Sequence, residues 1–155
     1  MRLAKKPRTE NNTVNNNIKN VNNINVFGKE SIGHITDAKL QELLADPDTS
    51  VSRLVTLKHS VQENKNVRVP NVRDKWVEVL VDDGEGGRRW DTVPKGDILA
   101  DVVEANAMLL ENEADEETGP GARYSRWHQR LMDSQEQNGR LFRGQLDRVH
   151  KSFTI

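Results

Sequence analysis

Hydrophobic residues first take up a helical spacing near Thr36. They recur every three or four positions there, as they do when one face of a helix packs on a core. Thr36 or Asp37 can cap the start of this helix, and Pro47 ends it. The spacing therefore predicts a short amphipathic helix whose apolar stripe consists of Leu40, Leu43 and Leu44.

A second helix is predicted from about Thr49 to Ser60. Lys58 falls on its apolar face, and we expect the ammonium group of this side chain to reach outward to solvent. The apolar residues of the same face are Val51, Leu54 and Val55.

In the middle of the chain, the spacing of apolar residues changes to the alternation that is typical of strands. Asn66–Val69 is predicted to be a short strand, and Lys75–Val81 has the clearest strand pattern in the sequence. Asp82–Gly87 then forms a turn, and Arg88–Asp91 is the returning strand of a hairpin. Two tryptophans bracket this hairpin and are expected to pack in the core or against the hairpin: Trp76 and Trp90.

Helical spacing returns at Pro94 and gives a long helix with a wide apolar face, which ends in an acidic run, Glu111–Glu117. We interpret the acidic run as a solvated face. A break at Thr118–Gly121 precedes a last helix over about Tyr124–Ser152. Two glycines weaken this helix, so that it either kinks or needs a partner helix: Gly139 and Gly144.

The beginning of the chain differs from the rest. Residues 1–10 form a basic tail, and nine of residues 11–25 are asparagine. Asparagine is a poor helix former, and the apolar residues of this tract are all β-branched, which favours extended chain. The tract is either a flexible linker or a strand that pairs between copies of the protein. Its apolar positions are Val14, Ile18, Val21, Ile24 and Val26.

Composition supports one domain with appendages. The chain has 155 residues, of which 34% are hydrophobic and 30% are charged, and its net charge is -1. Cysteine is absent, which excludes disulfides, thiol nucleophiles and cysteine zinc sites. There is no apolar run of the roughly 20 residues that span a bilayer, and no signal-peptide core. We therefore expect no membrane partner and a protein that is not secreted.

No set of residues predicts catalysis or cofactor binding. The four histidines are scattered, and the Asp82–Gly87 turn lacks the spacing of a calcium loop. The segment from His59 to Val69 is the most particular one. We interpret it as a helix-to-strand turn in which Asn64 and Asn66 hydrogen-bond the backbone, with a recognition loop as the alternative. The chain is expected to be non-enzymatic, with no catalytic or metal site and no cofactor.

Two of these segments resemble a known family. The stretch NNINVFGKESIGHIT, then LKHSVQENKNVRV, a tryptophan-bearing hairpin and a helix ending in VHKSF resemble the C-terminal domain of many uncharacterised proteins of nucleocytoplasmic large DNA viruses. That domain often follows a zinc-finger-like segment and an Asn-rich stretch. The chain has no zinc finger, and Gln62 replaces the usual proline. The residues that match its motifs are Phe27, Gly28, Glu30, His59, Glu63, Asn64 and Asn66.

The sequence thus predicts an α+β fold: a small β-hairpin sheet packed by helices, preceded by an extended Asn-rich segment and followed by a long C-terminal helix. The expected divisions are a basic tail (1–10), an Asn-rich segment (11–26), an α+β domain (27–118) and the C-terminal helix (119–155).

The leading functional hypothesis is a structural, assembly or adaptor protein of a large DNA virus, located in the virion or the infected cell. Such a protein would contact viral or virion proteins and form a homo-oligomer, with a trimer as one stoichiometry. We expect self-association through the Asn-rich segment and through Leu141, Phe142, Leu146 and Val149 of the last helix.

The main alternative is a DNA-binding or regulatory module, in which basic residues contact phosphates. A third alternative, an enzyme fragment or nuclease accessory, has no residue set behind it. The candidate nucleic-acid contacts are Lys5, Lys6, Arg8, Arg88, Arg89, Arg140, Arg143 and Arg148.

Overall fold

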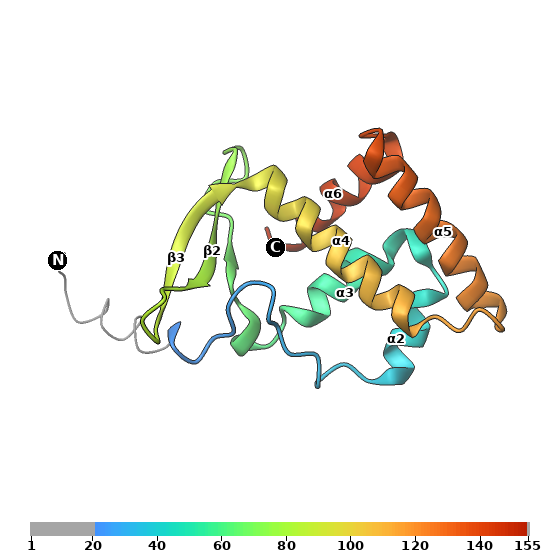
Figure 1. Cartoon of the computed structure of the whole chain (residues 1–155), viewed down its shortest axis with the longest axis horizontal. Helices are drawn as coiled ribbons and strands as arrows, with labels where there is room; N and C mark the ends of the chain where they lie inside the picture. Colours follow the sequence, from blue (N-terminus) through green and yellow to red (C-terminus); the bar gives the residue numbers. More distant parts are fainter. Residues whose placement is uncertain (1–20, 155) are drawn as a thin grey trace.

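A computed structural model describes residues 21–154, and these residues form the α+β fold predicted from the sequence. The sheet lies at one end, and the helices gather at the other (Figure 1). The elements in chain order are α2 (Asp37–Leu44), α3 (Pro47–Lys58), the 3-10 turn η1 (Gln62–Asn64), β1 (Val67–Arg68), β2 (Trp76–Asp82), β3 (Arg88–Pro94), α4 (Lys95–Glu113), α5 (Gly119–Glu136) and α6 (Arg140–Ser152).

The first two helices begin as their sequences dictate. The Thr36 hydroxyl accepts a hydrogen bond from the Lys39 backbone N–H at 3.1 Å, which caps α2. Pro47 occupies the first turn of α3, so this helix begins two residues before the predicted position. The apolar stripe of α2 is buried as predicted, and so are Val51, Leu54 and Val55 of α3.

The three strands form an antiparallel sheet in the order β1-β2-β3. Asp83 stabilises the β2–β3 turn, because its carboxylate accepts hydrogen bonds from the backbone N–H groups of Glu85 and Gly87 at 2.8 and 2.9 Å. Gly84 and Gly86 have φ angles of +81° and +85°, which glycine adopts without strain. β3 runs on to Pro94 and therefore pairs with β2 along its whole length.

One face of the sheet packs on the helices, and the other is partly exposed. Val77, Val79 and Val81 alternate toward the helical side, where Val93 lies opposite Val77. Trp76 points to the opposite side and is 53% exposed, so of its two predicted placements, in the core or against the hairpin, the first was wrong.

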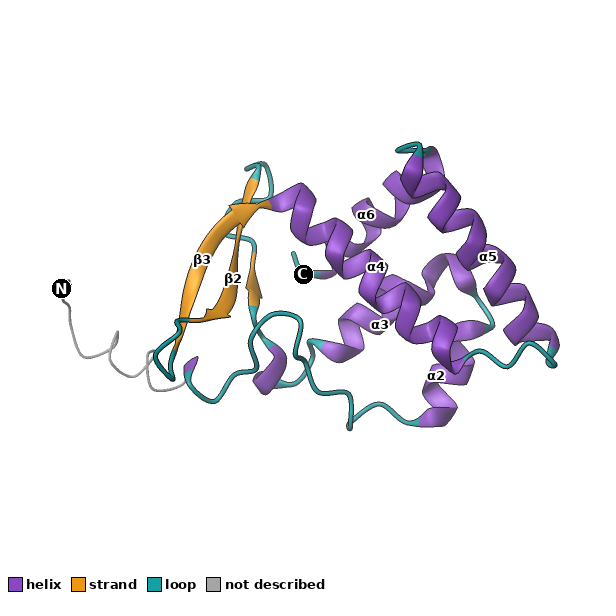
Figure 2. Ribbon diagram, in the orientation of Figure 1, coloured by secondary structure: helices purple, strands orange, loops and turns teal. Residues whose placement is uncertain are grey.

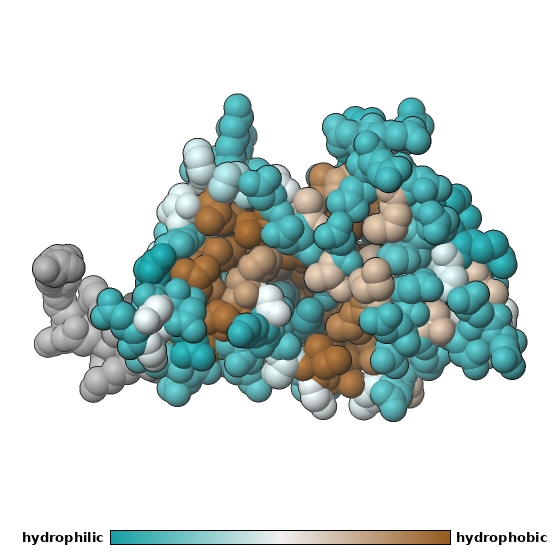
Figure 3. All heavy atoms as spheres, viewed as in Figure 1, coloured by the Kyte–Doolittle hydropathy of each residue, from teal (hydrophilic) through white to brown (hydrophobic). Residues whose placement is uncertain are grey.

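Helix α4 links the sheet to the helical end, as it runs from β3 across α3 and α6 (Figure 2). Most of the core lies where α4 meets α2, α3, α5 and α6. In Figure 3, hydrophilic residues cover most of the helical end, whereas apolar residues gather over the sheet and in a second group low in the middle of the view. The largest fully buried side chains are Tyr124, Leu43, Leu44, Leu54, Leu80, Leu110, Leu131, Val51, Val55, Val77, Val103 and Val149.

The C-terminal region contains two helices rather than the single helix predicted over Tyr124–Ser152. Asn138 takes a left-handed conformation with φ 49°, and Gly139 precedes the first turn of α6. The Gly139 N–H donates to the Ser134 carbonyl at 2.8 Å, which closes α5. The chain therefore turns, and α6 packs back against α3, α4 and α5.

Within residues 21–154, no helix combines the length and the apolar character needed to cross a membrane.

Candidate binding cavity at the sheet edge

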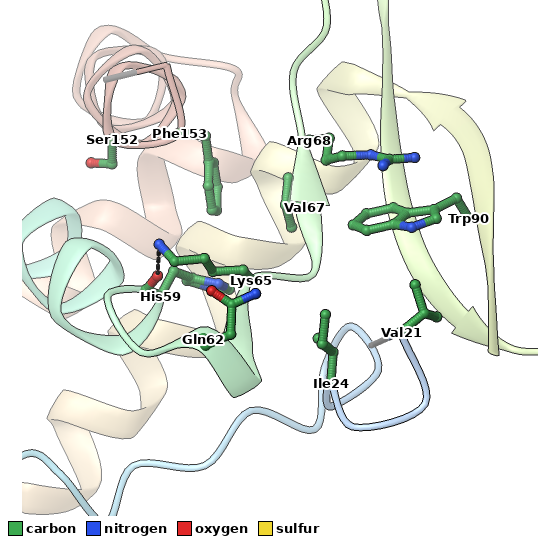
Figure 4. A pocket seen from close by; sticks show the side chains of 10 residues that line it. All are labelled: Val21, Ile24, His59, Gln62, Lys65, Val67, Arg68, Trp90, Ser152 and Phe153. Atoms are coloured by element: carbon green, nitrogen blue, oxygen red, sulfur yellow. Dashed lines mark hydrogen bonds between the residues drawn. The ribbon is translucent and has the colours of Figure 1, made fainter. Parts of the chain in front are cut away.

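A cavity of about 500 Å³ lies where the sheet, the η1 turn, the end of α6 and the start of the described chain meet (Figure 4). Its floor and walls come from segments that are far apart in the sequence. The sheet-edge cavity is lined by Val21, Ile24, His59, Gln62, Lys65, Val67, Arg68, Trp90, Ser152 and Phe153.

Trp90 and Arg68 form the sheet wall of the cavity. The Arg68 guanidinium reaches across the central strand and lies 3.7 Å from the centre of the Trp90 ring, which is a cation–π contact. Its Nε also donates to a carboxylate oxygen of Glu78 at 3.0 Å. The pair therefore presents a flat, partly charged surface that can hold an aromatic or amide group of a ligand.

His59 and Phe153 form the opposite wall. Their rings meet edge to face, with centroids 5.1 Å apart. The His59 Nδ1 lies 2.6 Å from the Asn64 carbonyl oxygen and donates a hydrogen bond to it. Burial lowers the pKa of His59 below its ordinary value, so the ring is neutral at pH 7.

Strand β1 contributes an open backbone edge beside the cavity. The Leu80 N–H donates to the Asn66 carbonyl at 2.9 Å, so Asn66 faces β2. Antiparallel pairing alternates, and the N–H and C=O groups of Val67 therefore point away from β2. Within residues 21–154 no strand lies beyond β1. An extended segment can pair with such an edge and place alternate side chains in the cavity.

A cluster of buried polar side chains lies next to the cavity and fixes the segments that form its walls. The Glu30 side chain is only 7% exposed, and one of its carboxylate oxygens lies 3.7 Å from the Lys58 ammonium nitrogen. The Asn66 amide donates to the other Glu30 oxygen at 2.7 Å, and the Gly28 N–H donates to it at 2.9 Å. Lys58 also donates to the Asn106 side-chain oxygen at 2.9 Å.

The burial of Lys58 overturns the prediction that its ammonium group reaches solvent. Lys58 is 7% exposed, and desolvation lowers its pKa from the ordinary lysine value, although Glu30 opposes this effect. The reason for the difference is Glu30, which a distant loop brings to the apolar face of α3. A charged residue is buried where a partner of opposite charge is buried with it.

Asn64 joins the start of the described chain to the helix-to-strand turn. Its side-chain NH₂ donates to the carbonyls of Ser31 and Lys58 at 2.7 and 2.8 Å, and its oxygen accepts from the Ser31 N–H and the Asn25 amide, both at 3.0 Å. The Asn66 amide donates to the Asn25 carbonyl at 3.0 Å. The predicted backbone hydrogen bonds of both asparagines are thus confirmed.

The predicted self-association residues do not form one surface. Val21 and Ile24 line the cavity, and Val26 is half-buried, while Val14 and Ile18 lie outside the described residues. Two residues of α6, Phe142 and Val149, are buried within the core of their own chain, so little of either side chain is left for a second copy. The other two pack against this core and are partly buried: Leu141 and Leu146.

The predicted nucleic-acid contacts fall on two separated surfaces. Arg88 and Arg89 lie at the hairpin, where Arg89 donates to Asp91 at 2.8 Å. The α6 residues Arg140, Arg143 and Arg148 are exposed at the helical end. The tail residues Lys5, Lys6 and Arg8 lie outside the described part of the chain.

Sequence reasoning missed Arg68 and Phe153 as cavity residues and Lys58 as a buried charge. Lys58 had a signal, because it shares helical spacing with three buried apolar residues of α3. Arg68 and Phe153 had none, since β1 has only two residues and the cavity exists only after four segments come together.

Among the described residues, no cluster of three or more histidine, aspartate or glutamate side chains is arranged to hold a metal ion. Comparisons of the chain with protein-family models, with curated proteins and with solved structures give no match. The resemblance to a domain of large DNA viruses therefore stays a prediction.

Proposed function

We propose that this protein is a non-enzymatic assembly or adaptor protein that binds an extended segment in the sheet-edge cavity. The single observation that carries the proposal is the cavity itself: about 500 Å³ of space beside the open edge of β1. Aromatic and apolar side chains supply contact area there, and the backbone of Val67 supplies hydrogen bonds. The buried cluster of Glu30, Lys58, Asn64 and Asn66 fixes the walls before binding.

The proposed occupant is the Asn-rich segment of a second copy. Val21 already lines the cavity, and residues 11–20 directly precede it in the sequence. Ten extended residues reach about 33 Å, which is enough to enter a neighbouring copy. Val14 and Ile18 supply apolar side chains, and the asparagines supply donors and acceptors for the strand edge. Copies that exchange segments in this way form a reciprocal dimer or a closed ring such as a trimer.

The resemblance described above supports assigning this role to a component of a large DNA virus, in the virion or the infected cell. This part of the proposal rests on the resemblance alone.

The test is the solution mass of full-length variants, measured by light scattering over a range of concentrations. Val14→Asp with Ile18→Asp places two charges on the proposed contact residues and is expected to give a monomer. Asn15→Asp with Asn17→Asp adds the same charge to the same segment at polar positions. This matched control is expected to keep the mass of the wild-type oligomer.

A second pair of variants tests the cavity. Gln62 is exposed at the cavity rim, so Gln62→Trp should fill the space without disturbing the core, and the oligomer should dissociate. Gln137 is exposed at the end of α5 and does not line the cavity, so Gln137→Trp should leave the mass unchanged. A wild-type chain that stays monomeric at every concentration would overturn the proposed self-association.

A further inference from the structure

A second hollow lies on the helical end and is lined by basic side chains. It has a volume of about 420 Å³ and lies between α3 and α6, with α2 at its border. The α3–α6 groove is lined by Lys39, Ser52, Arg53, Thr56, Leu57, Arg148, Lys151 and Ser152. The Ser152 hydroxyl donates to the Ser52 carbonyl at 3.3 Å, so the two helices are tied together at the groove.

Positive charge dominates this groove. Four of its side chains are cations, from three different helices: Lys39, Arg53, Arg148 and Lys151. Two carboxylates stand among them. Glu42 accepts from Lys39 at 3.2 Å and from Arg53 at 2.7 Å, and Asp147 lies 3.1 Å from Lys151. The four cations therefore outnumber the two anions, although the whole chain carries a net charge of -1.

The exposed face of α6 extends the positive charge beyond the groove. Arg140 and Arg143 are exposed on the same helix as Arg148 and Lys151. From Arg140 to Lys151 the helix rises about 16 Å, so these cations form a row rather than a point. A row of this kind fits a ligand that repeats its negative charges at regular intervals.

We propose that the α3–α6 groove, with the α6 row, binds the phosphate backbone of nucleic acid. The hydroxyls of Thr56 and Ser152 already donate hydrogen bonds to helix carbonyls. They therefore offer no free donor to a neutral ligand that would be recognised by hydrogen bonds. Leu57 is the only apolar residue of the lining, and the carbon chains of the polar and charged side chains supply the rest of its nonpolar surface. The lining therefore lacks the buried aromatic and apolar anchors from which protein interfaces draw most of their affinity. Its cations are the groups that sequence-independent phosphate contacts require.

This proposal is independent of the sheet-edge cavity, because the two sites share only Ser152. The hairpin arginines are not part of it, because they lie on β3 and do not line the groove.

The test measures binding of full-length protein to a fluorescent 20-base-pair DNA duplex, by anisotropy at several salt concentrations. The wild type should bind with an affinity that falls as salt rises. Arg148→Ala with Lys151→Ala should weaken binding about tenfold or more and lower the slope of log affinity against log salt by about 2. Arg88→Ala with Arg89→Ala removes the same charge at the hairpin and should leave both quantities unchanged.

Any of three results with the duplex would overturn the proposal: no salt-dependent binding by the wild type, equal losses in the two double variants, or a loss confined to the hairpin variant. A polyglutamate peptide serves as the competing acidic partner. If it binds as tightly as the duplex and with the same dependence on Arg148 and Lys151, the groove takes acidic protein and the nucleic-acid proposal fails. The oligomer mass is read separately, so failure here leaves the assembly proposal untouched.

Discussion

The helical end and the sheet junction are stabilised in different ways. The helical end packs mainly apolar side chains, such as Leu54, Leu110 and Leu131, whose burial depends little on direction. The polar side chains buried there are Ser50, Asn106, His128 and Gln145. The sheet junction instead buries a carboxylate, an ammonium group and two amides: Glu30, Lys58, Asn64 and Asn66. Hydrogen bonds and ion pairs depend strongly on geometry, so this cluster fixes where the start of the described chain lies against the sheet. The first region is therefore stabilised mainly by apolar burial, whereas the second depends on matched polar partners that also fix the shape of the cavity.

The largest loss in the free energy of unfolding is expected from removing one member of the buried ion pair between Glu30 and Lys58. Glu30→Ala leaves the Lys58 ammonium with the Asn106 oxygen as its partner among the described residues, and it removes the carboxylate that accepts from Asn66 and Gly28. Losing one partner of a buried ion pair costs about 3–5 kcal/mol of the free energy of unfolding. Urea denaturation of the full chain measures this loss.

A double variant separates the loss of the two buried charges from the loss of the Glu30 side chain itself. Glu30→Gln with Lys58→Met removes both charges and keeps an oxygen to accept from Asn66. Apolar replacement of a complete buried pair is often neutral, so this variant should be much more stable than Glu30→Ala. If the two variants lose the same stability, the ion pair does not account for the cost.

A smaller loss of stability is expected from adding a side-chain carbon at Gly121, at the helical end. Gly121 lies in the first turn of α5, where the Thr118 hydroxyl accepts from its N–H at 3.0 Å. A Cβ atom at this position would lie 1.9 Å from the Asp115 carbonyl oxygen, which is backbone and cannot rotate away. Gly121→Ala should therefore destabilise the chain by about 2–3 kcal/mol, as overpacking does. Gly119→Ala is the control, because nothing lies within 4 Å of a Cβ there.

The two regions also differ in how far the sequence predicts them. The apolar spacing and the cap at Thr36 were enough to place α2, and the glycine turn was enough to place the β2–β3 hairpin. These features are local, since neighbours in the sequence determine them. The sequence indicated a weak point at Gly139, but it did not predict a complete division between α5 and α6, which depends on the left-handed conformation of Asn138 as well.

The candidate site was harder to predict for a physical reason. Val21 and Ile24 were predicted to mediate self-association, which stays a prediction, and in the structure they line the cavity of their own chain. Arg68 and Trp90 become a wall only because strand register puts them on the same sheet face. Lys58 is buried only because Glu30 arrives from another segment. Such pairings depend on tertiary structure, which residue spacing along one element does not contain.

A change of pH should act on the sheet junction. Burial lowers the pKa of His59 in the folded chain, although the hydrogen bond to Asn64 and the charge of Glu30 oppose this, and Lys58 and Lys65 reinforce it. The unfolded chain then binds more protons, so the stabilisation is full above about pH 6.5 and is lost as pH falls through the lowered folded value. Burial also lowers the pKa of His150 in α6, which acts with the same sign.

Urea midpoints at pH 8 and at pH 5.5 measure this dependence, and we expect the lower midpoint at pH 5.5. His59→Gln should reduce the difference between the two midpoints and leave the part due to His150. An unchanged difference in this variant would show that other groups carry the dependence.

The smallest change in the free energy of unfolding is expected from a substitution of Gly144, and this change is a gain in stability and not a loss. Gly144 is exposed within α6, and nothing lies within 4 Å of a Cβ placed on it. Glycine inside a helix costs about 0.5–1 kcal/mol relative to alanine, so Gly144→Ala should stabilise the chain by that amount in urea denaturation. The substitution does not touch the polar cluster or the cavity, so the oligomer mass should not change. A stabilised chain with a changed mass would mean that α6 itself contacts a second copy, and the helical end would then share the assembly role that we assign to the sheet junction.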